Sequence, residues 1–173
     1  MGIRRWISGT LRADRFEADE VDADSVDTDS LSVNKSFTVL GLGDSQNISN
    51  NTVTEVEFES IEADNLNAAD VANNRIAMPE DGKYLISASI DWSSNEDWST
   101  GDRAAPLPTV NGSVSPRVNS RRLKISTGRE DKPAPTFAAD LSSGDHVTLN
   151  AFQDSGSDQE MRAETQLIVV KLG

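Results

Sequence analysis

The sequence predicts an all-β protein: a trimeric jelly-roll β-sandwich that follows an extended repeat stem. Short runs rich in β-branched and aromatic residues recur at about 8–12-residue spacing between turn residues, which is typical of sandwiches and jelly rolls. Helical periodicity is almost absent, and a five-residue repeat occupies the first part of the chain. We therefore divide the chain into residues 1–12, a docking peptide; 13–36, the stem; and 37–173, the jelly-roll head.

The stem carries a large apolar residue at every fifth position from residue 6 to residue 31. Five residues rotate a helical side chain by about 140°, so the apolar positions would form no stripe. In a flat strand an odd step alternates faces. The pattern is consistent with bent units stacked on one another, as in a β-solenoid or an intertwined fibre. One pentad buries too little alone, so we expect three chains to share an axis. The stem positions expected to pack in this trimer are Leu11, Phe16, Val21, Val26 and Leu31.

The alternative to a stem is a disordered acidic tail, because residues 16–31 hold seven acids and no base. The strict phase of the repeat favours the stem, since disorder requires no phase. Stacked carboxylates of three stems would repel one another, so a structural cation between them is a further hypothesis. The acidic run itself lacks the glycine and the bidentate glutamate of an EF-hand. We expect no other cofactor or metal.

The first twelve residues combine basic and apolar side chains ahead of the acidic stem. Tryptophan and arginine are the residues that interface hot spots favour. We therefore expect a particle-docking peptide that orders against an acidic partner; the alternative is a frayed terminus. Its candidate contact residues are Ile3, Arg4, Arg5, Trp6, Ile7 and Arg12.

The composition is strongly acidic, with 29 Asp and Glu against 16 Lys and Arg and a net charge of −13. Arginine outnumbers lysine 11 to 5, and aromatic residues make up only 5%. Such surfaces resemble those of proteins from salt-loving archaea and their viruses, because molar salt screens the self-repulsion. Nucleic-acid binding is disfavoured, since phosphate recognition requires a basic face. We also expect no membrane insertion and no secretory signal.

The head is expected to contain short strands separated by turns. Residues 53–60 alternate as a half-buried strand, and residues 84–90 form the best core strand after the turn 79–82, in which Gly82 is expected to supply a positive φ. Residues 93–107 are expected to be a surface loop with Trp92 and Trp98 near its base, and Asn111-Gly112 a tight hairpin turn. Residues 109–113 are expected to be a strand that enters this hairpin turn. The other predicted strands are 37–40, 123–126, 137–141, 147–152 and 166–172.

A second basic cluster stands in the head. It could bind a carboxylate-rich or sulfated glycan or a neighbouring acidic stem; local charge balance is an equally good explanation. This candidate ligand surface comprises Arg117, Arg121, Arg122 and Lys124.

Two motifs resemble the complement-type globular head, within the tumour necrosis factor-like jelly rolls. Residues 74–87, Asn74-Arg-Ile-Ala-Met-Pro79-Glu-Asp-Gly82-Lys-Tyr84-Leu-Ile-Ser, are similar to that family's proline, glycine and tyrosine strand, with Ile76 where an aromatic is usual. Residues 141–149 resemble its leucine, glycine-aspartate, valine, leucine strand, and 166–172 are placed as its last strand. The resemblance covers roughly residues 53–173.

The resemblance implies a sandwich of about ten strands that forms homotrimers around an apolar axis, often on a stalk. The residues expected in the core or trimer contacts of the head are Tyr84, Ile86, Ile90, Val147, Leu149, Leu167 and Val169.

The sequence offers little for catalysis. It has one histidine, no cysteine, and no nucleophile-elbow or phosphate-loop motif, so we expect no enzyme. Stem, trimeric head and acidic surface together resemble a surface spike, turret, decoration or fibre protein of a haloarchaeal virus. Such a protein would assemble in the host cytoplasm with capsid or tail proteins and contact a host surface glycan or surface layer. A non-viral glycan-binding adhesin module is the alternative.

Overall fold

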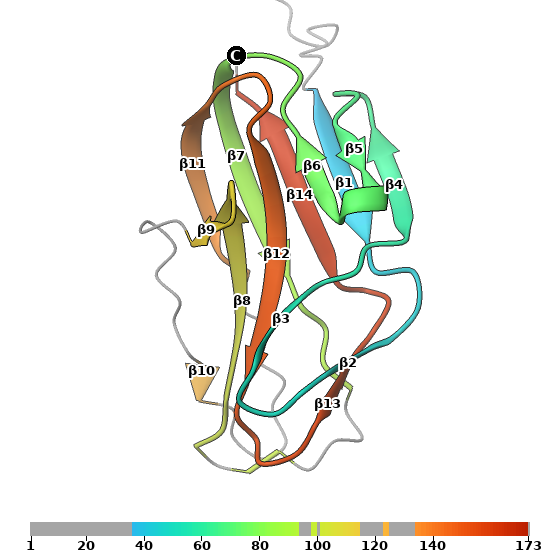
Figure 1. The fold of residues 1–173 in the computed structure, drawn as a ribbon, viewed down its shortest axis with the longest axis vertical. Helices are drawn as coiled ribbons and strands as arrows, with labels where there is room; N and C mark the ends of the chain where they lie inside the picture. Colours follow the sequence, from blue (N-terminus) through green and yellow to red (C-terminus); the bar gives the residue numbers. More distant parts are fainter. Residues whose placement is uncertain (1–35, 94–97, 100, 115–122, 125–133, 173) are drawn as a thin grey trace, which may run out of the picture. The chain divides into compact units, whose positions relative to one another are not determined.

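The computed structural model describes residues 36–93, 98–99, 101–114, 123–124 and 134–172. The chain divides into two units, Met1–Val33 and Asn34–Gly173, and all described residues belong to the second (Figure 1). The docking peptide and the stem residues named above lie outside the described part of the chain, as do Arg117, Arg121 and Arg122. Of the basic cluster, only the backbone of Lys124 is described.

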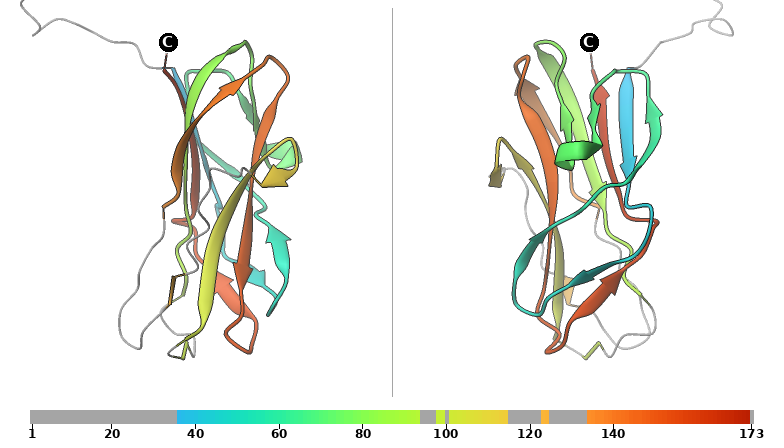
Figure 2. Two further views of the ribbon diagram at one scale, coloured as in Figure 1. Left: turned by 90° about the vertical axis from the view of Figure 1, so that its left-hand side faces the viewer. Right: turned by 45° about the vertical axis from the view of Figure 1, so that its right-hand side comes forward.

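The described unit is an antiparallel β-sandwich, as predicted. One layer is a five-stranded sheet in the order β11-β7-β14-β1-β4, and Figure 2 shows it facing the second layer. The start of β1 pairs with the end of β14, Phe37 opposite Val170, so β1 starts and β14 ends at the same end of the sandwich. We call the opposite end the distal end (Figure 1). The strands of this sheet are β1 (Phe37–Gly41), β4 (Ser60–Asp64), β7 (Gly82–Ser89), β11 (Thr136–Leu141) and β14 (Gln166–Lys171).

The second layer is a seven-stranded sheet in which β12 is central. It runs in the order β10-β8-β12-β6-β5, with β3 also paired to β12 and β9 to β8. A separate two-stranded sheet of β2 (Gln46–Ile48) and β13 (Gln159–Met161) closes the distal end. The strands of the second layer are β3 (Val53–Glu55), β5 (Ala69–Asp70), β6 (Arg75–Ala77), β8 (Arg103–Val110), β9 (Ser113–Val114), β10 (Leu123–Lys124) and β12 (His146–Gln153).

Among the described residues the only helix is one short 3-10 turn, η2 (Val71–Asn73). No helix in this part of the chain is long and apolar enough to cross a membrane.

The core lies between the two layers and follows the period of two expected of strands. On β7, Tyr84, Ile86 and Ala88 point inward, and on β14 Leu167 and Val169 do the same. The inward residues of β12 are Val147, Leu149 and Ala151, each 0% exposed. Ile76, which replaces the usual aromatic, is also fully buried.

The predicted strand over residues 53–60 is divided between the two sheets. Its alternation is correct, because Val56 and Phe58 are buried between exposed neighbours. Its hydrogen bonds change partner, however: the N–H of Val56 donates to the carbonyl of Leu149 at 2.9 Å, whereas that of Glu59 donates to Gly41 at 3.3 Å. The segment therefore crosses from one layer to the other.

The predicted surface loop over residues 93–107 is too long, because β8 begins at Arg103. Pro106 and Pro108 lie within β8, opposite Ala151 and Leu149 of β12. Proline cannot donate to a ladder, but alternate residues of a strand direct their N–H groups away from a given neighbour. Because Pro106 and Pro108 are two positions apart, both can face away from β12, and Leu107 between them, opposite Asn150, keeps its N–H for that neighbour.

Two turn predictions have different outcomes. Asn111 and Gly112 have φ values of 49° and 75°, so the predicted tight hairpin turn is confirmed. The positive φ expected of Gly82 is wrong, since Gly82 is not among the described positive-φ glycines. Its requirement is space instead: a Cβ there would lie 3.0 Å from Lys171 Cε and 3.4 Å from Tyr84 Cε2.

Candidate interaction surfaces

The outer face of the five-stranded sheet carries apolar side chains that the sandwich core does not cover. The apolar side chains that alternate with the core positions of β1, β7 and β14 project there, and they are half-buried. Single exposed apolar residues are ordinary, but a contiguous set marks a surface for association. The set, which we call the outer apolar band, is Phe37, Val39, Leu85, Ile168 and Val170.

Strand register makes the outer apolar band continuous. Val170 of β14 lies opposite Phe37 on one side and Leu85 on the other. One row further along, Ile168 lies opposite Val39 and Ser87. The band therefore crosses three neighbouring strands, close to the end of the sandwich at which β1 begins.

Polar groups bound the band on both sides. Toward the distal end, Gln166 donates through Nε2 to Glu62 Oε2 at 2.6 Å. The Glu62 carboxylate lies so close to Gly41 that a Cβ there would be 2.5 Å from Glu62 Oε1. At the other end, Lys83 Nζ and Asp140 Oδ1 are 3.8 Å apart across β7 and β11.

The residues predicted for the head's core or trimer contacts all lie in the core of one chain. Each is 0% exposed, so none is available to a second chain in the folded unit. The set is Tyr84, Ile86, Ile90, Val147, Leu149, Leu167 and Val169. The outer apolar band was not among the predicted sites, although the run 166–172 is apolar on both faces and contains two of its members.

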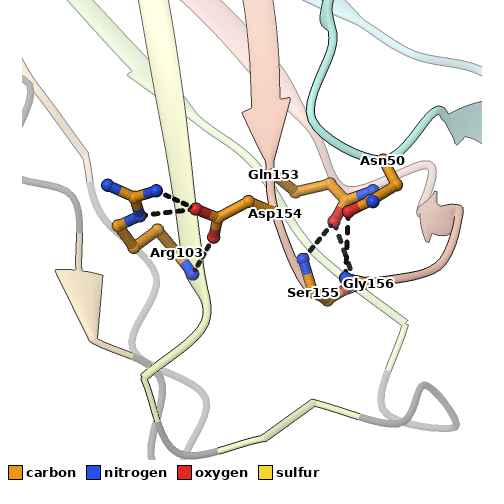
Figure 3. Close-up of polar contacts among 6 residues, drawn as sticks. All are labelled: Asn50, Arg103, Gln153, Asp154, Ser155 and Gly156. Atoms are coloured by element: carbon orange, nitrogen blue, oxygen red, sulfur yellow. Dashed lines mark hydrogen bonds and ion pairs between the residues drawn. The ribbon is translucent and has the colours of Figure 1, made fainter.

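The distal end holds a polar cluster in the loop between β12 and β13 (Figure 3). Gln153 Oε1 accepts from the N–H of Ser155 at 2.8 Å, and Asn50 Oδ1 accepts from the N–H of Gly156 at 2.9 Å. Asp154 binds Arg103, with Oδ1 accepting the backbone N–H of Arg103 at 2.7 Å and Oδ2 accepting from Nε at 2.5 Å. These contacts fix the loop against β8 and the segment after β2.

An aromatic pair precedes β8 in the sequence. Trp92 and Trp98 meet edge to face, with ring centroids 5.5 Å apart and an interplanar angle of 71°. Trp92 is buried and Trp98 half-buried, which agrees with their expected place at the base of a loop.

Carboxylates in the head are stabilised by local donors. Burial would raise the pKa of Asp64, but hydrogen bonds from the Thr38 hydroxyl and the N–H groups of Ala68 and Ala69 outweigh it and lower this pKa.

Burial raises the pKa of Tyr84, whose hydroxyl donates to the carbonyl of Glu80 at 2.8 Å.

Basic side chains in the described part are engaged by acids. Each lysine or arginine whose side chain the structure describes lies within 4.0 Å of a carboxylate. The pairs are Arg75–Asp70, Lys83–Asp140, Arg103–Asp154, Arg162–Asp91 and Lys171–Glu80. No group of three or more His, Cys, Asp or Glu residues suited to a metal ion occurs among the described residues.

Comparison with known proteins identifies the fold. No family model matches the sequence, and no curated protein matches it significantly. Solved structures that resemble it include murine APRIL at pH 5.0, with TM-score 0.56 and 15% identity over 80% of this chain and 99% of that one. Another is the globular domain of zebrafish complement 1qA protein, with TM-score 0.51 and 10% identity over 80% of this chain and 98% of that one. The head therefore has the jelly-roll fold of tumour necrosis factor-like and complement-type heads.

Proposed function

We propose that the protein is a homotrimeric virion surface protein, a spike, turret or decoration protein whose N-terminus docks on the particle and whose head is displayed outside. The observation that carries the proposal is the outer apolar band. A contiguous apolar band on an otherwise acidic head is best explained by contact with further copies of the chain.

Threefold assembly is supported by two independent features. First, the head has the fold of tumour necrosis factor-like and complement-type heads, and resemblance to these heads implies trimers. Second, the pentad repeat needs apolar partners, which two further chains would supply. The strand register suggests where the subunits would meet, because the outer apolar band runs across β1, β14 and β7. Its members would face the threefold axis.

The chain path suits display from a particle. The first strand of the head, β1, starts beside the end of β14, at the end of the sandwich opposite the distal end. Under this proposal, the end that contacts solvent, a host surface glycan or a host surface layer is the distal end of the head, which Figure 1 shows. The acidic surface suits a haloarchaeal host at molar salt.

Light scattering in molar salt tests the oligomer: we expect three times the chain mass, and a monomer would contradict the proposal. Deletion of residues 1–12 tests the particle role, because the truncated protein should remain a trimer and fail to join particles. Incorporation of the truncated protein would contradict docking by this peptide. A trimer that is absent from purified virions would favour the adhesin module. If the protein is present in virions, electron microscopy of the particles would show whether it lies on the capsid or in a tail fibre.

A further inference from the structure

Two buried polar atoms at the distal end have no hydrogen-bond partner among the residues that the structure describes: Trp92 Nε1 and Gln159 Oε1. Trp92 is 7% exposed and Gln159 is 0% exposed, so bulk water does not reach these atoms freely. Buried polar atoms in native proteins nearly always have a partner, from protein or from ordered water. One atom is a donor and the other an acceptor.

Strand register places the two side chains on the same side of two adjacent segments of the chain. Trp92 forms an isolated antiparallel bridge with Met161, and the same register continues where the N–H of Ser93 donates to Glu160 O at 2.9 Å. Gln159 stands two residues before Met161, and both are buried where Glu160 is exposed. Trp92 and Gln159 are therefore diagonal neighbours, a spacing that long and aromatic side chains bridge.

The other end of the Gln159 amide is already engaged. Its Nε2 donates to Ser155 Oγ at 2.8 Å and to Ser157 Oγ at 3.1 Å. Turning the amide over would place its oxygen against the two hydroxyls and leave the nitrogen in need of a partner. A further polar group is required in either orientation.

Hydrogen bonds connect Gln159 to a second buried amide, that of Gln153. Ser155 Oγ donates to Gln153 Oε1 at 2.8 Å. Gln153 Nε2 in turn donates to the carbonyls of Ile48 at 3.0 Å and Ser157 at 2.9 Å, which fixes the orientation of its amide. The hydrogen bonds thus run from Gln159 through Ser155 and Gln153 to the backbone of β2.

We propose that a single internal water molecule is bound between Trp92 Nε1 and Gln159 Oε1. It accepts from the indole N–H and donates to the amide oxygen, which provides two of the partners that a buried water needs. Both unpartnered atoms are then satisfied. The hydrogen bonds form a continuous series from Trp92 through the water, Gln159 and Ser155 to Gln153, and each bond polarises the next. This site is independent of the proposed function and of the oligomeric state.

The water would join parts of the chain that are far apart in sequence. Trp92 follows β7 of the five-stranded sheet, Gln159 begins β13, and Gln153 ends β12. It would therefore attach the small two-stranded sheet, and the loop in Figure 3, to the body of the sandwich.

A high-resolution crystal structure of the full chain tests the site. We expect a density peak within hydrogen-bond distance of both Trp92 Nε1 and Gln159 Oε1, and in solution a nuclear Overhauser effect between the Trp92 indole proton and a long-lived water. Absence of this peak in well-ordered density would overturn the proposal, as would a direct Trp92–Gln159 hydrogen bond or another protein partner for both atoms.

Matched variants separate the water from general packing. Trp92→Phe keeps a buried ring but removes the donor, so the peak should weaken or vanish and the melting temperature should fall. Trp98→Phe makes the same change in the half-buried neighbouring ring and should leave the peak intact. A peak unchanged in Trp92→Phe would show that the indole does not hold the water; if that variant fails to fold, the wild-type density decides.

Discussion

Asp154 binds both the backbone and the side chain of Arg103. Its Oδ1 accepts the Arg103 N–H at 2.7 Å, and its Oδ2 accepts from the guanidinium Nε at 2.5 Å. The N–H of Asp154 donates back to the Arg103 carbonyl at 3.0 Å. The Asp154 side chain is 16% exposed and that of Arg103 43%, so the carboxylate is the more buried partner.

Removal of this carboxylate should destabilise the head. Asp154→Ala leaves a backbone N–H and part of a guanidinium without their acceptor, so we expect a loss of about 1–3 kcal/mol of unfolding free energy. Lys83→Ala, at the exposed Lys83–Asp140 pair, is the control and should change it by about 0–1 kcal/mol. Denaturant unfolding measures both, and equal effects would show that the distal contact is as weak as the surface pair.

A charge within the outer apolar band should break the proposed trimer. In Val170→Asp, three carboxylates would be buried near one axis without partners, which is unfavourable. We expect light scattering to show monomers, while circular dichroism retains the wild-type β-sheet spectrum, because Val170 does not point into the core.

Val53→Asp is the matched control for that substitution. Val53 is 57% exposed and pairs with β12 in the other sheet, so the same change should leave the trimer intact. Dissociation by Val53→Asp and not by Val170→Asp would place the interface on the seven-stranded sheet instead.

The stability contribution of Asp64 should be lost in acid. Its pKa is lower in the folded than in the unfolded protein, because the hydrogen bonds from Thr38, Ala68 and Ala69 outweigh its burial. The contribution is therefore complete above the unfolded value of about 3.9 and disappears as the pH falls through the folded pKa.

Asp64→Asn removes that titration while preserving the size of the side chain. We expect it to melt below wild type at about pH 6, and the difference to shrink as the pH falls below about 4. Glu164→Gln, at an exposed residue, serves as a control for loss of one negative charge. A difference that stays constant with pH would contradict the role of Asp64.

Salt should stabilise the protein strongly. With a net charge of −13, self-repulsion is screened within about 10 Å at 0.1 M salt and about 3 Å at 1 M. We expect the melting temperature to rise between these concentrations, by scanning calorimetry, with sodium and potassium chloride acting alike. A flat response would contradict the halophilic interpretation.

The sequence was most informative where one strand face is buried. The alternation of Tyr84, Ile86 and Ala88 predicted β7, and the apolar residues Val147 and Leu149 predicted β12, because inward residues are constrained to be apolar. These strands and their turns also carry the resemblance that indicated the fold.

Elements that depend on distant partners could not be predicted in the same way. The strands β2 and β13 are three residues each and pair across more than a hundred residues of sequence. The proline-containing β8 looked like a loop because its pairing with β12 is visible only in three dimensions. Likewise, which face of residues 166–172 is internal depends on the register with β1 and β7.

The place of β1 has a mechanical consequence. It is held on one side by β14 and on the other by β4, and the chain enters it at its first residue. A pull on that entering segment along the strand would load both rows of hydrogen bonds together in shear, instead of opening them one at a time. A head tethered in this way would resist extraction under flow better than one attached through an edge strand peeled from its end.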